Sequence, residues 1–142
     1  MMTDTHADTV AANRALGAQF FKEQDRLRGG PAEALCAPDY TAVIGGNPPM
    51  NRAGHEGFAL GFYAGFPDAM HHVEEVFATK DRVSVRFRIR ATHTGNFFGI
   101  PSTGRPIDVS ANVIMHVAHG RVTRLLALFD ESGLLRQLGV LG

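Results

Sequence analysis

A strict alternation of apolar and polar residues from Arg82 to Thr92 constrains the fold of this chain more than any other feature. One set of alternate positions is apolar and comprises Val83, Val85, Phe87, Ile89 and Ala91. The positions between them hold Ser84, Arg86, Arg88 and Arg90. A period of two is typical of a β-strand with one buried and one exposed face. We therefore expect a sheet whose apolar face is covered by other elements.

Further strand-like runs surround this segment and predict two β-hairpins. The first hairpin joins His71–Ala78 to Arg82–Thr92 through Thr79–Asp81, and the second joins Ile107–Ala118 to Arg121–Phe129 through His119-Gly120. An earlier β-rich run, Tyr40–Ile44, ends at two glycines.

Helical patterns come mostly before the hairpins. Apolar residues at near-helical spacing predict a helix from Asp8 to about Arg28, stopped by Gly29-Gly30-Pro31. Further helices are expected over Pro31–Cys36, Gly54–Phe66 and Gly133–Leu138, the last with Asp130 among its capping residues. Helices followed by long antiparallel strands predict an α+β fold, with helices on one face of a curved sheet, and residues 1–142 read as a single domain.

Composition excludes several classes of protein. The chain has 14 Lys and Arg against 14 Asp and Glu, so no basic stripe favours nucleic acid. Its apolar runs are too short to span a bilayer, and Met1–His6 lacks the pattern of a secretory signal. Cys36 is the single cysteine, which excludes an intrachain disulfide and suits a cytoplasmic location. The seven histidines lack metal-ligand spacing, so we do not expect a metal site.

The register of the second hairpin decides which side chains share a face. A three-residue turn at Ala118–Gly120 would pair Val117 with Arg121. The face expected under the helices then contains Val109, Ala111, Val113, Met115, Val117, Thr123, Leu125, Ala127 and Phe129. The opposite face contains Asp108, Ser110, Asn112, Ile114, His116, Val122, Arg124, Leu126 and Leu128. Ile114, Leu126 and Leu128 make this outer face too apolar for open water, so we expect a homodimer through it.

The segment from Thr92 to Arg105 combines glycines, a proline, a histidine and two phenylalanines. It is too apolar for a plain solvent loop and too rich in glycine for a strand, which predicts the lip of a pocket. The chain resembles the SnoaL-like polyketide cyclases of the NTF2-like superfamily from Asn13 to Gly139. The matching segments are Asn13–Phe21, Ala37–Tyr40, Gly54–Asp68, the H-x-G-x-x-x-G-x-P-x-T pattern in His93–Arg105, and Gly133–Gly139.

The resemblance implies a cone-shaped α+β barrel with helices closed over a small-molecule pocket. It also implies an intramolecular aldol ring closure of a polyketide ester, in which a carboxylate acts as general acid/base without a metal or cofactor. Counted from Gly120, the family's aspartate position falls on Ala127, and its histidine partner falls on Val113. Neither residue transfers a proton, which argues against standard aldol chemistry.

Two other residues are therefore the candidate catalytic groups. His93 lies in the loop and either binds a ligand carbonyl or fixes the loop through backbone bonds. A three-residue turn at Thr79–Asp81 would place Glu75 on the inner face, where burial would raise the pKa of its carboxyl, whereas a slipped register would place Glu74 there. The residues expected to bind ligand are Tyr40, Tyr63, Phe87, Phe97, Ala111, Val113 and Ala127.

These observations predict a small-molecule protein, of polyketide cyclase type, that acts on an apolar polyketide-like substrate. An apolar pocket would then catalyse ring closure mainly by folding the substrate. A non-catalytic ligand-binding or accessory protein and a hydroxylase-like relative remain the alternatives.

Overall fold

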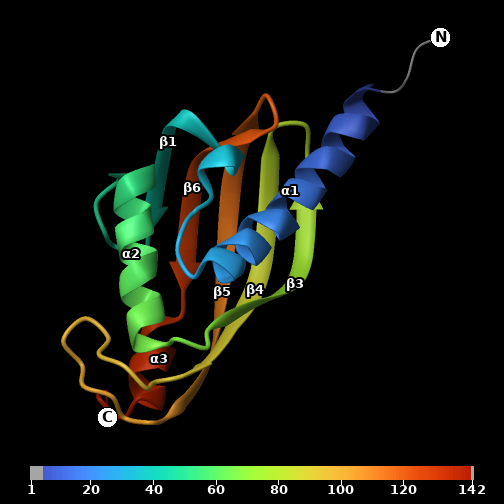
Figure 1. Cartoon of the computed structure of the whole chain (residues 1–142). Helices are drawn as coiled ribbons and strands as arrows, with labels where there is room; N and C mark the ends of the chain where they lie inside the picture. The colour runs from blue at the N-terminus through green and yellow to red at the C-terminus, as the bar shows by residue number, and fades with distance from the viewer. Residues whose placement is uncertain (1–4, 142) are drawn as a thin grey trace.

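The computed structural model describes residues 5–141 as three α-helices, one 3₁₀ turn and six strands in a single sheet (Figure 1). In chain order the elements are α1 (Thr5–Leu27), η1 (Glu33–Leu35), β1 (Cys36–Ile44), β2 (Met50–Asn51), α2 (Arg52–Gly65), β3 (Met70–Ala78), β4 (Arg82–Thr92), β5 (Pro106–Ala118), β6 (Arg121–Phe129) and α3 (Glu131–Gln137). The predicted α+β fold is confirmed. The predicted single domain of residues 1–142 also includes positions outside the described range.

The sheet has the order β2-β1-β6-β5-β4-β3, which leaves β2 and β3 as its edges, so it is curved but not closed into a barrel. All its pairs are antiparallel except β1 with β6, which is parallel. The expectation of a purely antiparallel sheet is wrong at this pair. A hairpin forces antiparallel pairing, whereas the long connection between β1 and β6 leaves their relative direction free.

Helices α1 and α2 cover the same face of the sheet, where α1 crosses the strands obliquely and α2 lies over the β1 side (Figure 1). The long α1 contacts β3 and β4, while the short α3 packs against β5. Asn51 and Asp130 begin α2 and α3 by accepting hydrogen bonds from Gly54 N and Gly133 N. The predicted cap at Asp130 is therefore confirmed.

The alternation that predicted β4 describes its burial correctly. Its five apolar residues are all buried beneath the helices, whereas Ser84, Arg86 and Arg90 are exposed and Arg88 is half-buried. The five apolar residues of β4 belong to a hydrophobic core that continues through β5 and β6 and into α1 and α2. Any cavity between the sheet and the helices is therefore lined on one side by these apolar side chains.

The first hairpin has a different register from the predicted one. Ala78 pairs with Val83 rather than Arg82, because the turn contains four residues instead of three. A β-bulge between Val73 and Glu75 shifts the strand again. Since one residue of slip exchanges the two faces of a strand, Glu75 lies opposite Arg86 on the outer side.

The second hairpin also turns more tightly than expected. His119 and Gly120 both have positive φ, as a two-residue turn requires, and Ala118 pairs with Arg121. Val122 is consequently buried rather than on the outer face. A bulge at His116/Val117 restores the predicted assignment of side chains to the two faces beyond it, although Val113 pairs with Ala127 and not with Leu125 as the predicted register required. The turn was predicted wrongly, but the inner face from Ala111 to Met115 was predicted correctly.

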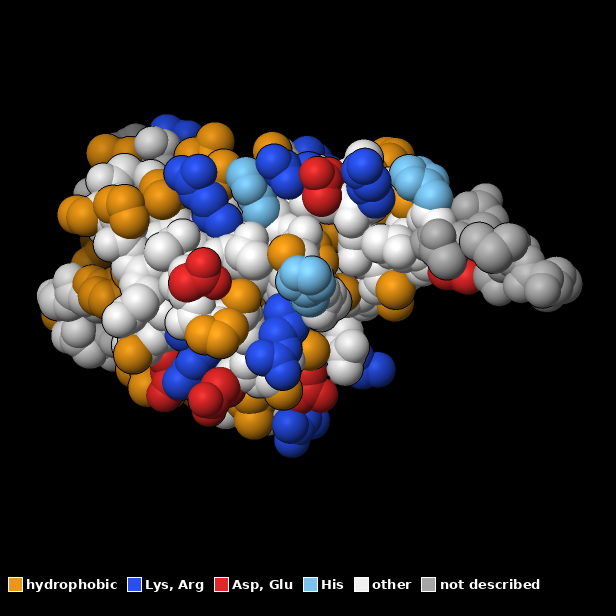
Figure 2. All heavy atoms as spheres, turned by 90° about the horizontal axis from the view of Figure 1, so that it is seen from above, with side chains coloured by type: hydrophobic (Ala, Val, Ile, Leu, Met, Phe, Trp, Pro, Cys, Tyr) orange, Lys and Arg blue, Asp and Glu red, His pale blue; other side chains and the backbone are white. Residues whose placement is uncertain are grey.

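The outer face of the sheet mixes ion pairs with exposed apolar residues. Asp108 accepts from Arg88 at 2.8 Å and from Arg90 at 3.4 Å, while Ile114 and Leu128 are 47% and 70% exposed. Figure 2, which views the molecule from above, likewise shows positively charged, negatively charged and apolar side chains intermixed, without a large patch of one charge.

Within residues 5–141, no helix has the length and apolarity needed to cross a membrane.

Candidate functional site

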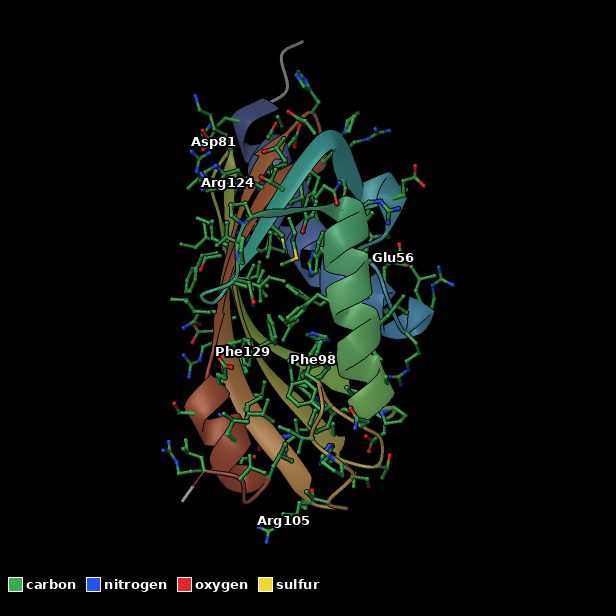
Figure 3. All side chains as sticks on the ribbon, turned by 90° about the vertical axis from the view of Figure 1, so that its left-hand side faces the viewer. Glu56, Asp81, Phe98, Arg105, Arg124 and Phe129 are labelled. Carbon is green, nitrogen blue, oxygen red and sulfur yellow. The ribbon has the colours of Figure 1, made fainter. Side chains whose placement is uncertain are left out.

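A narrow, mainly apolar cavity of about 80 Å³ lies between the inner face of the sheet and the two long helices. Its lining comprises Phe21, Gln24, Ile44, His55, Phe58, Ala59, Phe62, Tyr63, His71, Phe87, Ile89, Ala111, Val113, Leu125, Ala127 and Phe129. In Figure 3, Phe129 points into the space between the sheet and α2, whereas Glu56 and Arg124 lie on opposite outer sides. Polar groups are few in this cavity, so each one bears strongly on the chemistry it supports.

The first polar group is a buried cluster in which the Asp25 carboxylate accepts three hydrogen bonds. His71 Nδ1 lies 2.7 Å from Oδ1, the His71 backbone N–H donates to Oδ2 at 2.7 Å, and the Tyr63 hydroxyl donates to Oδ1 at 2.6 Å. The side chains of Asp25 and His71 are each only 6% exposed. An ionised carboxylate only accepts hydrogen bonds, so Nδ1 of His71 carries a proton.

This cluster keeps Asp25 ionised although it is buried. Burial alone would raise the pKa of the carboxyl, but the hydrogen bonds and charge of His71 and the hydroxyl of Tyr63 outweigh that effect. The pKa of Asp25 is consequently below its ordinary value. Burial and the bond to Asp25 raise the pKa of Tyr63, so its hydroxyl remains a donor.

With its Nδ1 bonded to Asp25, His71 has its second ring nitrogen, Nε2, available. The described residues provide no hydrogen-bond partner for Nε2, and His71 is part of the cavity wall. The ring packs against both Phe21 and Phe87, with centroid distances of 5.2 and 4.9 Å, and these two rings also contact each other. A histidine oriented by a carboxylate and held in an apolar wall can accept a proton from a bound molecule.

A second polar pair lies on the α2 side of the cavity. The Tyr40 hydroxyl is 2.8 Å from Nδ1 of His55, and both side chains are buried. Burial, and then the charge of His71, lower the pKa of His55 to about 4, so this ring is neutral near pH 7. Gln24 adds an amide whose Oε1 is buried without a hydrogen-bond partner among the described residues.

Most of the residues predicted to bind ligand line this cavity. Tyr63, Phe87, Ala111, Val113 and Ala127 are all in its wall, and Val113 lies directly opposite Ala127 in the sheet. The predicted inner wall therefore comes together in one place.

Two of the predicted ligand-binding residues are set back from the cavity. Tyr40 lies behind His55, to which it is hydrogen bonded. Phe97 packs edge-on against Phe62 and Phe66, and neither it nor Tyr40 is among the described lining residues. Both support the wall from behind.

His93, the first predicted catalytic residue, is fully buried at the base of its loop. Its Nδ1 accepts the backbone N–H of Thr103 at 3.1 Å and lies 2.9 Å from the Thr103 hydroxyl. Its backbone exchanges two hydrogen bonds with Arg105 and Gly104, and its ring lies against Phe66. His93 is not among the described lining residues, and these contacts fit a residue that fixes the loop.

Glu75, the second predicted catalytic residue, is exposed on the outer side of β3. Its neighbour Glu74 is exposed as well and lies 3.4 Å from Arg86. Neither carboxylate is among the described lining residues. The burial predicted for one of these two carboxylates is therefore absent from the structure.

Sequence reasoning missed Asp25, His71 and His55, which the fold brings together around the cavity. Asp25 belongs to α1 and lies 46 residues before its partner His71. A signal was available for His71, because its position alternates with the exposed His72 at the start of a strand. No local pattern distinguishes Asp25 from the other charged residues of α1.

Within residues 5–141, no group of three or more His, Cys, Asp or Glu side chains is arranged to hold a metal ion.

Several solved structures share this fold over nearly the whole chain. AclR, a proposed hydroxylase from Streptomyces galilaeus, is 24% identical with a TM-score of 0.83, over 94% of this chain and 88% of that one. A proposed SnoaL-like polyketide cyclase from Jannaschia sp. CCS1 is 18% identical with a TM-score of 0.79, over 100% and 99% of the two chains. IdmH, a proposed polyketide cyclase from Streptomyces antibioticus, is 29% identical with a TM-score of 0.71, over 94% and 98%.

A comparison with curated proteins gives no significant match. The sequence profile of the SnoaL-like polyketide cyclases, by contrast, matches residues 11–138, which include both polar clusters and the entire cavity wall. The match covers most of the chain and agrees with the fold of the structural neighbours. The chain belongs to the SnoaL-like polyketide cyclase family.

Proposed function

We propose that this protein is an enzyme of polyketide cyclase type that removes a proton next to a carbonyl group of an apolar substrate, with His71 as the general base. The observation that carries the proposal is that His71 lies in the wall of the cavity and is held by Asp25, with Nδ1 and Oδ1 2.7 Å apart. Membership of the family supports the substrate class, because the walls around this pair are almost entirely apolar.

The chemistry follows from the two nitrogens of the His71 ring. Nε2 takes the proton from the carbon, and the C–H electron pair moves into the adjacent carbonyl to form an enolate. Asp25 stabilises the resulting imidazolium through Nδ1–H without taking the proton itself. The enolate carbon then attacks a second carbonyl of the same molecule, which closes a ring, and the proton on Nε2 is returned to the new alkoxide.

The apolar walls contribute by holding the substrate in a reactive conformation. An enolate and a carbonyl held in contact react far faster than the same groups free in solution. On the resemblance, the usual acid/base positions fall on Val113 and Ala127, whose small apolar side chains only shape the wall. The proposal therefore assigns the base to His71 of β3, with its carboxylate partner on α1, on another side of the same cavity.

Deuterium exchange into a test ketone examines this assignment without knowledge of the natural substrate. The probes are 1-indanone and ethyl benzoylacetate, which combine an aromatic body with an acidic C–H, and exchange in D₂O is followed by NMR. The wild-type protein should accelerate exchange beyond free imidazole at equal concentration. His71→Gln should lower the rate by roughly 10²–10⁴-fold, the usual contribution of a general base.

The matched control is His72→Gln, because His72 is the exposed neighbour of His71 on the same strand. This variant should retain the wild-type rate. The proposal fails if His71→Gln exchanges the probes as fast as the wild type. It also fails if no probe exchanges faster than with imidazole.

The second candidate is a binding protein without catalysis, which the predominance of apolar lining favours. In that case 1-indanone should bind, seen as chemical-shift changes at cavity residues, with no acceleration of exchange.

We also infer a homodimer through the outer face of the sheet. The exposure of Ile114 and Leu128 on that face supports it.

A further inference from the structure

The polar pair on the α2 side of the cavity, Tyr40 and His55, is buried and hydrogen bonded like the Asp25–His71 pair. The proposed base mechanism assigns it no role. His55 faces the cavity from α2, one turn before Ala59 and two turns before Tyr63, so the three share one side of the helix. Tyr40 reaches His55 from β1, and their rings are nearly parallel at an interplanar angle of 8°. His55 is 5% exposed and Tyr40 is 2% exposed.

The hydrogen bond between them fixes which nitrogen of His55 carries the proton. A neutral imidazole has one donor nitrogen and one acceptor nitrogen. If Nδ1 donated to Tyr40, the buried Tyr40 O–H would have no acceptor among the described residues, and a buried unpaired hydroxyl is unfavourable. If Tyr40 donates instead, Nδ1 is the acceptor and the proton is on Nε2. The second arrangement satisfies the buried hydroxyl and is therefore favoured.

Nε2–H of His55 is then a donor that still needs an acceptor. The described residues provide no hydrogen-bond partner for Nε2, and His55 is part of the cavity wall. A carbonyl oxygen of a bound molecule is a natural acceptor, and an enolate oxygen is a stronger one because its charge is greater.

We propose that His55 binds the carbonyl oxygen of the substrate through Nε2–H and stabilises the negative charge that develops there, while Tyr40 holds the ring in this tautomer. The proposal rests on the function proposed above, since it gives the oxygen stabiliser for the enolate that His71 forms. His55 is thus a catalytic residue, and Tyr40 is a positioning residue.

The environments of the two histidines suit a division of labour between base and donor. His71 has a carboxylate partner that stabilises its cation, whereas His55 has only a neutral hydroxyl. The charge of His71 further disfavours charge on His55. When His71 takes the substrate proton, His55 consequently remains a neutral donor. Two like groups placed in contrasting environments are a common way to divide acid and base roles.

The tautomer of His55 is measurable in the wild-type protein without any ligand. Two-bond ¹H–¹⁵N correlation spectra of ¹⁵N-labelled protein at pH 7 distinguish a protonated Nε2 from a protonated Nδ1. We expect a neutral ring with its proton on Nε2, and a mixture of tautomers in Tyr40→Phe. A wild-type ring with its proton on Nδ1, or a cationic ring, overturns the proposal.

The contact with ligand is tested by the infrared carbonyl stretch of bound 1-indanone labelled with ¹³C at the carbonyl. Hydrogen bonding should lower this frequency in the wild type and in His71→Gln, but not in His55→Phe. Tyr40→Phe should give an intermediate shift. Should His55→Phe fail to fold, Tyr40→Phe and the wild-type spectra still decide the matter.

The kinetic expectation separates this proposal from the base assignment. Loss of one donor to a developing oxyanion costs on the order of 10²–10³-fold, so His55→Phe should slow exchange of 1-indanone by that factor. If the carbonyl shift depends on His55 but exchange does not depend on His71, the donor is right and the base is wrong. If exchange depends on His71 while the carbonyl shift is unchanged in His55→Phe, the donor is wrong and the base stands.

Discussion

Burial of His55 predicts a loss of stability in mild acid that one substitution should remove. The pKa of this histidine falls from an ordinary 6.5 to about 4 in the folded protein, because burial and the charge of His71 penalise its cation. Between these values the unfolded chain binds a proton that the folded chain does not. Stability is therefore complete above pH 6.5 and decreases as the pH falls towards 4.

The magnitude follows from the two pKa values. Each pH unit inside this window costs at most about 1.4 kcal/mol, and integration from pH 7 to pH 5 gives a loss of about 2 kcal/mol from His55 alone. His55→Gln is the informative change, because glutamine does not titrate and its amide oxygen can still accept from the Tyr40 hydroxyl. The variant should lose about 2 kcal/mol less than the wild type over the same interval.

The assay is urea denaturation followed by far-UV circular dichroism, at pH 7, 6 and 5 and at one fixed protein concentration. The remaining histidines are common to both proteins, so their contributions largely cancel in the difference. His72→Gln is the matched control, since the His72 side chain is exposed on β3. Equal losses in the wild type and His55→Gln would refute the account of His55 as a ring kept neutral by burial.

Three further predictions concern packing, a thiol and the outer face. Gly95→Ala should destabilise the protein by at least about 2 kcal/mol in urea melts, because the added Cβ would lie 2.0 Å from the Ala64 carbonyl oxygen; unchanged stability would contradict this contact. Burial raises the pKa of the Cys36 thiol to about 11, so Ellman's reagent should react with it only after unfolding, and rapid reaction of native protein would count against it. Leu128→Asp should shift the light-scattering mass from dimer to monomer, and a monomeric wild type would rule out the interface.

Local periodicity was sufficient for most of the fold. The alternation in β4 identified its buried side chains, and the spacing of apolar residues located α1 and α2 within a few residues. These patterns work because a side chain's direction in a helix or strand depends only on its own backbone. The same property placed Ala111, Val113 and Ala127 on one wall, once a bulge had compensated for the wrong turn.

Side-chain chemistry at the site depended on register and long-range contact, which local patterns do not encode. Glu75 was expected inside from a three-residue turn, but a turn of four residues places it outside. His93 was expected at a pocket from its loop, but its ring nitrogen is bonded to Thr103 within that loop. In both cases one or two residues of backbone geometry decided the environment of the side chain.

The sequence by itself determined the α+β fold, the apolar inner face of the sheet and the resemblance to the family. Only the tertiary structure brought Asp25 to His71 and Tyr40 to His55. The first pair forms where α1 packs against β3, and the second forms where α2 packs against β1. The two histidines thereby acquired different partners, a carboxylate for His71 and a neutral hydroxyl for His55, although the residue type is the same. A side chain's type is fixed by the sequence, but its charge and its free nitrogen depend on the partners that the fold provides.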